Sequence, residues 1–100
     1  MNESRLSSSD ALRRLRECLK SGLIQFHSHF KKRCKKRLID LQDVLFVLKH
    51  GLIREAAEFD LRFRQWRYKV EGRTPDGQEL EVIITFLEED ETLVLTVMIP

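Results

Sequence analysis

Hydrophobic residues in the first half of the chain recur every three or four positions, which is the spacing of an α-helix. Residues that favour helix ends, mainly Ser, Asp and Gly, divide this pattern into three segments. The pattern predicts helices that begin at Ser9 or Asp10, at Ser28 and after Asp40. Their inward faces are expected to hold Leu12, Leu15, Cys18 and Leu19, then Phe30, Cys34 and Leu38, then Leu41, Val44, Leu45 and Leu48.

After Gly51 the hydrophobic residues alternate with polar ones, which is typical of half-buried strands. A turn at residues 74–77 and an acidic turn at residues 88–91 keep the connections short, and this favours an antiparallel meander. The strands are predicted within residues 52–59, around residues 66–70, over residues 80–86 and over residues 92–99.

This order of elements indicates the α+β class, with about three N-terminal helices packed on one face of a 3–4-stranded antiparallel meander sheet. Residues 9–100 are expected to form this single domain and the polar residues 1–8 a disordered tail. Between the first two helices, residues 23–26 are apolar and form either an extended segment or an anchored connector.

The second face of the predicted sheet is less polar than a solvated face should be. By alternation it receives Ile83, Leu87, Val94 and Met98. One explanation is cover by the first helix or the tail, and the other is a surface for a partner or for a second copy of the chain.

The cysteines and the distribution of apolar residues indicate the cellular compartment of the protein. The two cysteines, Cys18 and Cys34, form no Cys-x-x-Cys pair, so both are expected to be reduced thiols of the core. No apolar run approaches the length of a membrane span, and residues 1–10 lack the apolar stretch of a signal peptide. These features predict a cytoplasmic protein without a membrane contact.

The net charge of +2 conceals an uneven distribution along the chain. Residues 1–73 contain all 18 Lys and Arg together with nine Asp and Glu, whereas residues 74–100 contain seven Asp and Glu and no cation. A distribution of this kind can produce one positive face that attracts phosphates.

One stripe of the second helix carries residues suited to phosphoryl chemistry. His29, Arg33 and Arg37 are four residues apart and therefore share one side of the helix, next to the stripe that faces the core. Lys32 and Lys36 flank them and are predicted to bind RNA. Cleavage of RNA by its own 2′-hydroxyl requires a base, for which His29 is the candidate, and cations on the phosphate, for which the two arginines are suited.

Other interpretations of this helix stay open. A run of Lys and Arg is typical of a solvated helix face, and also of a surface that binds nucleic acid without cleaving it. His27 and His29 lie near Cys34, but no fourth ligand is visible, so neither a metal site nor a cofactor is expected.

The strand region adds further cations, of which Arg67 and Arg73 are predicted to contact RNA. They lie around Trp66 and Tyr68, and basic residues interleaved with aromatic ones can stack single-stranded RNA. The alternation of the strand equally well places both aromatic residues in the core.

The chain resembles a bacterial family of small proteins with a domain of unknown function. The resemblance covers residues 12–100 and includes the motif Tyr-x-Val-x-Gly at residues 68–72, a Gly-x-x-Leu segment at residues 77–80 and the ending Thr96-Val97. Its most specific part is a His-x3-Arg-x3-Arg helix with the segment that follows, at His29, Arg33, Arg37, Ile39, Asp43, Val44, Val47, Leu48, Gly51 and Ile53.

That family is in turn similar to the compact BrnT and RelE/ParE toxins. The resemblance implies a helical part against a meander sheet, metal-independent endoribonuclease activity in a type II toxin–antitoxin system, RNA or the ribosome as target, and a cognate antitoxin as partner. The sequence thus supports two hypotheses. The first is a toxin-like or toxin-derived RNA-binding protein, and the second is a non-enzymatic protein that binds a partner, or itself as a homodimer, through the open sheet face.

Overall fold

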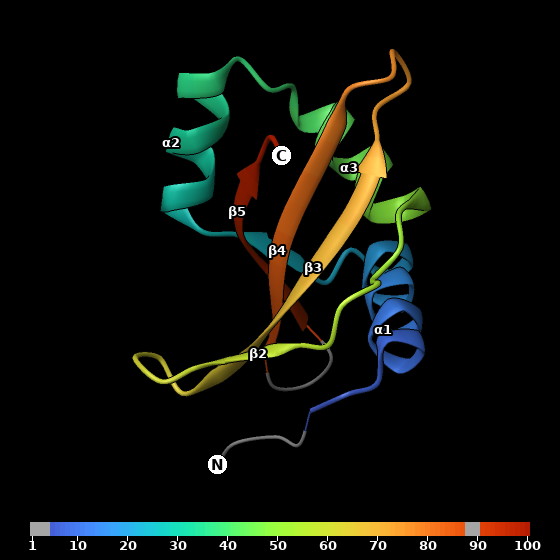
Figure 1. Cartoon of the computed structure of the whole chain (residues 1–100), viewed down its shortest axis with the longest axis vertical. Helices are drawn as coiled ribbons and strands as arrows, with labels where there is room; N and C mark the ends of the chain where they lie inside the picture. Colours follow the sequence, from blue (N-terminus) through green and yellow to red (C-terminus); the bar gives the residue numbers. More distant parts are fainter. Residues whose placement is uncertain (1–4, 88–90) are drawn as a thin grey trace.

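A computed structural model describes residues 5–87 and 91–100 (Figure 1). Helices and strands alternate at first, and the second half of the chain consists of strands alone. The elements are α1 (Ser8–Ser21), β1 (Ile24–Phe26), α2 (Ser28–Arg37), α3 (Leu41–His50), β2 (Glu58–Asp60), β3 (Gln65–Arg73), β4 (Glu79–Leu87) and β5 (Glu91–Met98).

The helices begin and end near the residues that the sequence predicts. Side chains cap the free backbone N–H groups at their starts, and glycine conformation ends α1. Asp40 caps α3 by accepting a hydrogen bond from the backbone N–H of Gln42 at 2.9 Å. Gly22 ends α1 in the left-handed conformation, with φ of 72°. Helix α2 begins at Ser28 as predicted, and α1 begins slightly earlier than predicted because Ser7 is its cap.

The sheet has five strands in the order β1-β5-β4-β3-β2, so the predicted number of three to four was too low. Strands β2 to β5 form the expected antiparallel meander, but β1 pairs with β5 in parallel, with Ile24 opposite Thr92 and Phe26 opposite Val94. This parallel pair joins segments almost 70 residues apart, and a local pattern cannot reveal it. The predicted strand at residues 52–59 is reduced to β2 and an isolated bridge between Leu52 and Glu71.

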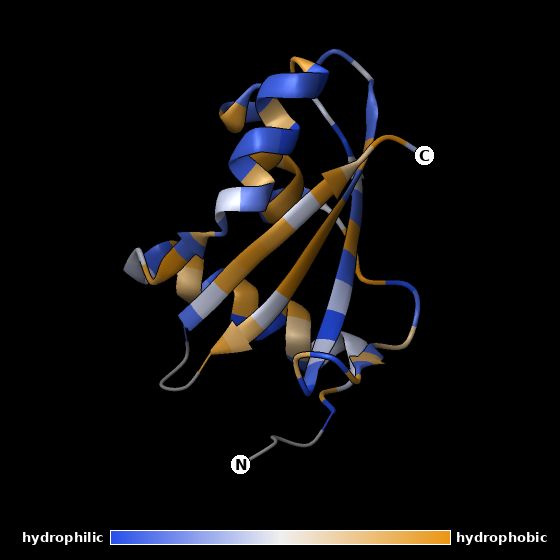
Figure 2. Ribbon diagram, turned by 90° about the vertical axis from the view of Figure 1, so that its left-hand side faces the viewer, coloured by the Kyte–Doolittle hydropathy of each residue, from blue (hydrophilic) through white to orange (hydrophobic). Residues whose placement is uncertain are grey.

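The helices build a single core against one face of the sheet. Figure 1 shows α1 and α3 behind the sheet and α2 beside β5, while the other face of β3 and β4 lies open toward the viewer. Viewed from the α2 side, the hydrophobic residues concentrate along the central strands and α2 is mostly hydrophilic (Figure 2). The buried core consists of Ala11, Leu15, Phe30, Val44, Val47, Leu48, Ile53, Tyr68, Val70, Leu80, Val82, Ile84, Val94 and Val97.

An irregularity in β5 shows that Val94 was wrongly assigned to the second face of the sheet. Val82 pairs with Val97 but Ile84 pairs with Val94, so Leu95 is an extra residue and the alternation of β5 changes sides there. Val94 is consequently fully buried in the core and does not belong to the open face. Ile83, with 8% of its surface exposed, and the half-buried Met98 remain beside each other on the open side.

The predictions for Leu38 and for the N-terminal tail differ from the structure. Leu38 was predicted to face the core, but it is 93% exposed, because α2 ends there with a left-handed residue (φ 56°) and Ile39 packs on the core instead. Of the predicted tail, residues 1–4 lie outside the described residues, Leu6 donates its N–H to the Tyr68 hydroxyl at 2.9 Å, and Ser8 already belongs to α1. Most of the predicted acidic turn, residues 88–90, also lies outside them.

None of the helices in residues 5–87 and 91–100 has the length and apolar character that a membrane crossing requires.

Candidate nucleic-acid interface

Helix α2 is the most highly charged element of the described structure. Its ten residues, SHFKKRCKKR, contain six Lys and Arg and no Asp or Glu. Phe30 is its one fully buried residue and packs on Phe26 with 5.1 Å between the ring centroids. The helix is thus anchored to the sheet along a narrow side and presents its cations to solvent.

The ends of α2 explain why this sequence is helical in spite of its charge. The Nδ1 atom of His27 accepts a hydrogen bond from the backbone N–H of His29 at 3.0 Å and caps the first turn. Lys35, Lys36 and Arg37 occupy the last turn, where positive charge is favourable to the helix dipole. The ring of His27 therefore caps the start of the helix, a role that the spacing of the histidines does not reveal.

The structure brings together the first two residues of the predicted stripe. The Nη2 atom of Arg33 lies 3.4 Å from Nε2 of His29. Because a guanidinium can only donate, Nε2 must act as the acceptor, and in the neutral ring the proton is then on Nδ1. His29 is exposed and Arg33 is half-buried, so the imidazole lone pair and the guanidinium meet at the surface. Arg37, which is also exposed, lies one helical turn further along.

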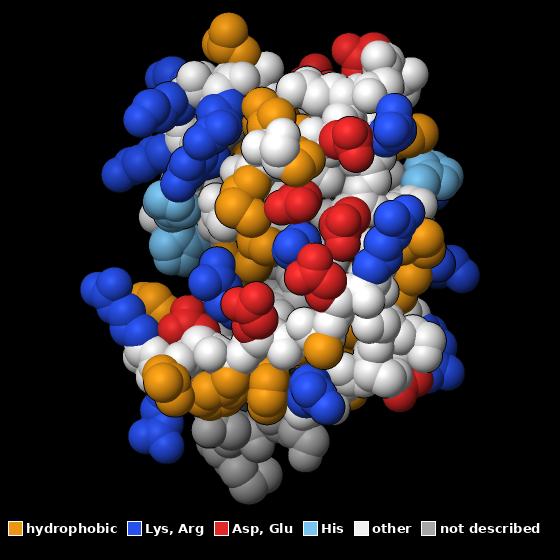
Figure 3. All heavy atoms as spheres, in the orientation of Figure 1, with side chains coloured by type: hydrophobic (Ala, Val, Ile, Leu, Met, Phe, Trp, Pro, Cys, Tyr) orange, Lys and Arg blue, Asp and Glu red, His pale blue; other side chains and the backbone are white. Residues whose placement is uncertain are grey.

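The other cations of α2 extend this surface. Lys32 and Lys36, for which RNA binding stays a prediction, are both exposed. No cation of α2 forms an ion pair with any residue that the structure describes. Figure 3 shows Lys and Arg side chains gathered along the left-hand edge of the molecule, over α2 and again below it, whereas Asp and Glu gather over the middle of the sheet.

Arg67 and Arg73, by contrast, are not brought into one site. They lie on the same face of β3 but six residues apart, which corresponds to about 20 Å along a strand. Arg67 lies 3.8 Å from the Asp60 carboxylate and Arg73 lies 3.9 Å from that of Glu79. In the sheet, β4 lies between β3 and the strand β5 against which α2 packs, so neither residue is adjacent to α2 within the sheet.

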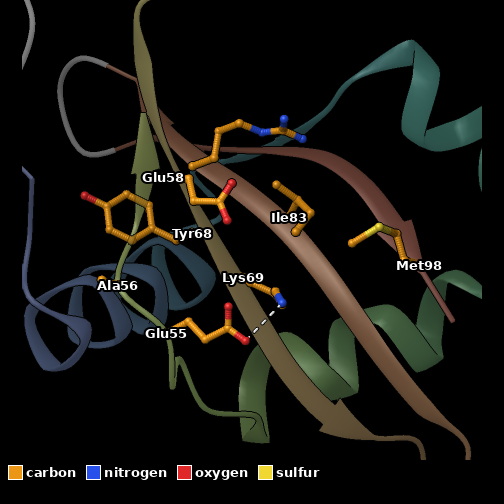
Figure 4. Close-up of a pocket in the computed structure, with 8 residues that line it drawn as sticks. Glu55, Ala56, Glu58, Tyr68, Lys69, Ile83 and Met98 are labelled. Carbon is orange, nitrogen blue, oxygen red and sulfur yellow. Dashed lines mark hydrogen bonds and ion pairs between the residues drawn. The ribbon is translucent and has the colours of Figure 1, made fainter. Parts of the chain in front are cut away.

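The open sheet face has a different character, because its charges neutralise one another. A shallow pocket of about 290 Å³ lies there, lined by residues that include Glu55, Lys69, Ile83 and Met98. The ammonium of Lys69 lies 3.3 Å from the Glu55 carboxylate (Figure 4). It also lies 4.0 Å from the carboxylate of Glu81. The hydrogen bond to Glu55 and the charge of Glu81 raise the pKa of Lys69.

The structure places both Trp66 and Tyr68 in or against the core. Tyr68 is 3% exposed and belongs to the core, and the half-buried Trp66 packs edge-on against Phe59 at 5.0 Å. Their alternative assignment to the core is thus confirmed for Tyr68. The exposed aromatic residue is Phe63, in the loop between β2 and β3, which the strand pattern did not single out.

The cysteines and histidines form no cluster that resembles a metal centre. Within residues 5–87 and 91–100, no group of three or more His, Cys, Asp or Glu could hold a metal ion. Cys18 is buried, and partial burial of Cys34 raises the pKa of its thiol.

Comparison with protein families places most of the chain in one of them. A family model described as "Domain of unknown function (DUF4258)" matches residues 26–99, which include α2, α3 and all strands except the first residues of β1. The chain matches no curated protein. It matches no solved structure either.

Proposed function

We propose that this chain, which belongs to the DUF4258 family, is an RNA-binding protein that holds the phosphate backbone on the exposed face of α2. The observation that carries this proposal is the set of six cations on ten helical residues, none of them in an ion pair with a described residue. Cations without partners are available to phosphates, and their binding releases counterions from the nucleic acid.

The cost of this charge to the protein supports the same conclusion. Lys31 and Lys35, Lys32 and Lys36, and Arg33 and Arg37 are like-charged pairs four residues apart on α2. Each such pair destabilises a helix by about 0.2–0.5 kcal/mol, so the three together cost roughly 1 kcal/mol. A bound polyanion removes this repulsion, whereas within the fold only the favourable interaction of the last-turn cations with the helix dipole offsets it.

A binding experiment tests the role of α2. The affinity for a labelled single-stranded RNA is measured by fluorescence anisotropy over a range of salt concentrations. Lys32→Gln combined with Lys36→Gln should weaken binding and reduce the slope of log affinity against log salt by about 1.4, because each phosphate contact contributes about 0.7.

The matched control for this experiment changes the same charge elsewhere. Lys20 on α1 and Lys49 on α3 are also exposed, and Lys20→Gln combined with Lys49→Gln should leave the slope close to that of the wild type. Equal effects of the two double variants would show that only the net charge matters, and α2 would then not be the binding surface.

We further propose that α2 cleaves the RNA that it binds. In this mechanism Nε2 of His29 takes the proton of a 2′-hydroxyl, which attacks the adjacent phosphorus, while Arg33 and Arg37 bind the non-bridging oxygens. The bond to the 5′-oxygen breaks, water supplies the proton for this oxygen, and the products carry a 2′,3′-cyclic phosphate and a 5′-hydroxyl. In the protein alone, Arg33 lies 3.4 Å from Nε2 of His29 and uses its lone pair; when Arg33 turns to the phosphate, this lone pair becomes free to take the proton.

Metal-independent cleavage is tested with RNA in a buffer that contains EDTA. The wild type should cut RNA but not DNA of the same sequence, and His29→Ala should lower the rate about 100-fold or more, as expected for loss of a general base. His50 on α3, also exposed, provides the control histidine, and His50→Ala should retain full activity. Unchanged activity in His29→Ala would remove His29 from the mechanism.

We extend the proposal to the cell on the expectation from the sequence that this family is similar to the BrnT and RelE/ParE toxins. A toxin-like protein of this kind would arrest growth when expressed alone, and an acidic partner that covers α2 would relieve the arrest. Growth arrest that persists in both His29→Ala and the Lys32→Gln, Lys36→Gln variant would disconnect toxicity from the α2 surface.

A second candidate function, that of a non-enzymatic interaction protein, rests on the open sheet face. Ile83 and Met98 give its pocket an apolar part between ion-paired side chains. A complex or dimer held there would persist in high salt, because burial and not phosphate contact would stabilise it. Association that disappears in moderate salt would favour RNA binding instead.

A further inference from the structure

The loop between β2 and β3, residues 61–64, exposes more apolar surface than folding explains. The side chain of Leu61 is 84% exposed and that of Phe63 is 63% exposed. Burial of a side chain of this size stabilises a protein by about 1.5–3 kcal/mol, and this loop gains little of that. Arg62 and Arg64 alternate with the two apolar residues, and neither forms an ion pair with a described residue.

The loop is held in a defined shape by Asp60. One carboxylate oxygen of Asp60 accepts hydrogen bonds from the backbone N–H groups of Arg62 at 2.9 Å and of Phe63 at 3.3 Å. Its other oxygen lies 3.8 Å from Nη1 of Arg67. The apolar side chains are therefore presented on a fixed backbone, so that little ordering is needed when a ligand binds.

The side chains at the tip suit a nucleic acid base better than an apolar surface. The guanidinium of Arg62 lies over the ring of Phe63, 5.4 Å from its centroid. An aromatic ring next to a guanidinium is the arrangement on which unpaired bases stack, and Arg64 adds a cation for the phosphate. A partner of purely apolar chemistry would instead leave both arginines without a counter-charge.

The position of the loop connects it to the proposed RNA surface. In Figure 1, α2 and the β2–β3 loop both project beyond the sheet on the same side of the molecule. Figure 3 shows Lys and Arg side chains along this edge, with His side chains between the upper and the lower group. A strand held by its phosphates on α2 could therefore continue toward the loop.

We infer that the loop of residues 61–64 is a base-stacking element that makes the protein selective for single-stranded RNA, with an unpaired base on the ring of Phe63. This inference rests on the proposed RNA-binding function. It adds that the ligand must have unpaired bases, because the bases of a duplex are stacked on each other and cannot reach the ring.

The test compares three ligands of equal length and charge per strand: a single-stranded RNA, the same RNA in a duplex, and a strand that lacks its bases over the central residues. Phe63→Ala should weaken binding of the single strand about 5- to 100-fold. The wild type should bind the strand without bases as weakly as the variant does, and duplex binding should be the same for both proteins.

Two further variants separate stacking from other effects of the loop. Phe63→Trp should restore the affinity, whereas Leu61→Ala, which removes a still more exposed apolar side chain without a π-face, should leave it unchanged. Equal losses in Leu61→Ala and Phe63→Ala would overturn stacking in favour of apolar docking, as expected for a protein partner. RNA binding that is insensitive to Phe63→Ala would overturn this inference alone, whereas a wild type without RNA binding would overturn the proposed function as well.

Discussion

The contact between Gly51 and Gly72 determines how α3 packs on the sheet. A Cβ atom at Gly72 would lie 3.2 Å from Cα of Gly51, and a Cβ atom at Gly51 would lie 2.6 Å from the carbonyl oxygens of both Val47 and Glu71. These oxygens belong to the backbone and cannot rotate away. Since φ of Gly51 is −76°, alanine is compatible with the backbone conformation, and the effect of Gly51→Ala is steric alone.

The loss of stability in Gly51→Ala follows from the two backbone segments that the added methyl group pushes apart. The Glu71 carbonyl accepts a hydrogen bond from the N–H of Leu52 at 2.9 Å, and the Leu52 carbonyl accepts one from the N–H of Glu71 at 2.8 Å. Separation of the two segments weakens both bonds, which contribute about 1 kcal/mol each, and overpacking adds about 1–3 kcal/mol. We expect a loss of roughly 2–4 kcal/mol in the free energy of unfolding, and a Tm lower by roughly 10–30 °C.

Thermal and urea unfolding, followed by circular dichroism, measure this loss. Gly22→Ala is the matched control, because a Cβ atom at Gly22 meets nothing within 4 Å and only its left-handed backbone, with φ of 72°, opposes alanine. The control should lose about 1 kcal/mol. If Gly51→Ala loses no more than Gly22→Ala, the close approach of the two backbones does not limit the packing and the reasoning is refuted.

Three other predictions follow from single residues. Leu38→Gly should stabilise the protein by about 1 kcal/mol in urea unfolding, since the exposed leucine occupies a left-handed position; a loss would mean that its side chain is needed. Cys34 should react with iodoacetamide more slowly than a free thiol at pH 8, because burial raises its pKa; unfolding in urea should abolish the difference. Lys69 should titrate by NMR above its ordinary value of 10.5, and Glu55→Gln should lower its pKa; the stability that this lysine contributes is complete below pH 10.5 and is lost as pH rises through the raised pKa. Equal titration in both proteins would rule out the Glu55 contact.

The helices could be predicted closely because their ends depend on neighbours in sequence. Asp40 caps α3 through an N–H two residues away, and Gly22 ends α1 through its own backbone conformation. The same locality makes the charge of α2 and the spacing of His29 and Arg33 visible in the sequence. Leu38 is the exception, because the left-handed turn that exposes it is made by a residue type that rarely adopts it.

The sheet and the candidate RNA surface depend on contacts between distant segments. The extra residue in β5 moves Val94 into the core, although strict alternation places it on the open face. In the same way, Tyr68 is buried and its hydroxyl accepts a hydrogen bond from the N–H of Leu6, whereas Phe63 is left exposed by a loop whose shape Asp60 holds. Alternation could not distinguish these aromatic residues, because burial depends on what packs above a strand.

The sequence by itself therefore determined the charge that α2 carries, the helix ends and the presence of a meander, all of which depend on residues within a few positions of each other. Only the tertiary structure decided which distant residues meet. Gly51 and Gly72 appear in the sequence as two separate glycines, and the fold places their backbones in contact. It likewise separates Arg67 and Arg73 from α2, since the order of strands is set by long-range pairing that no local pattern contains.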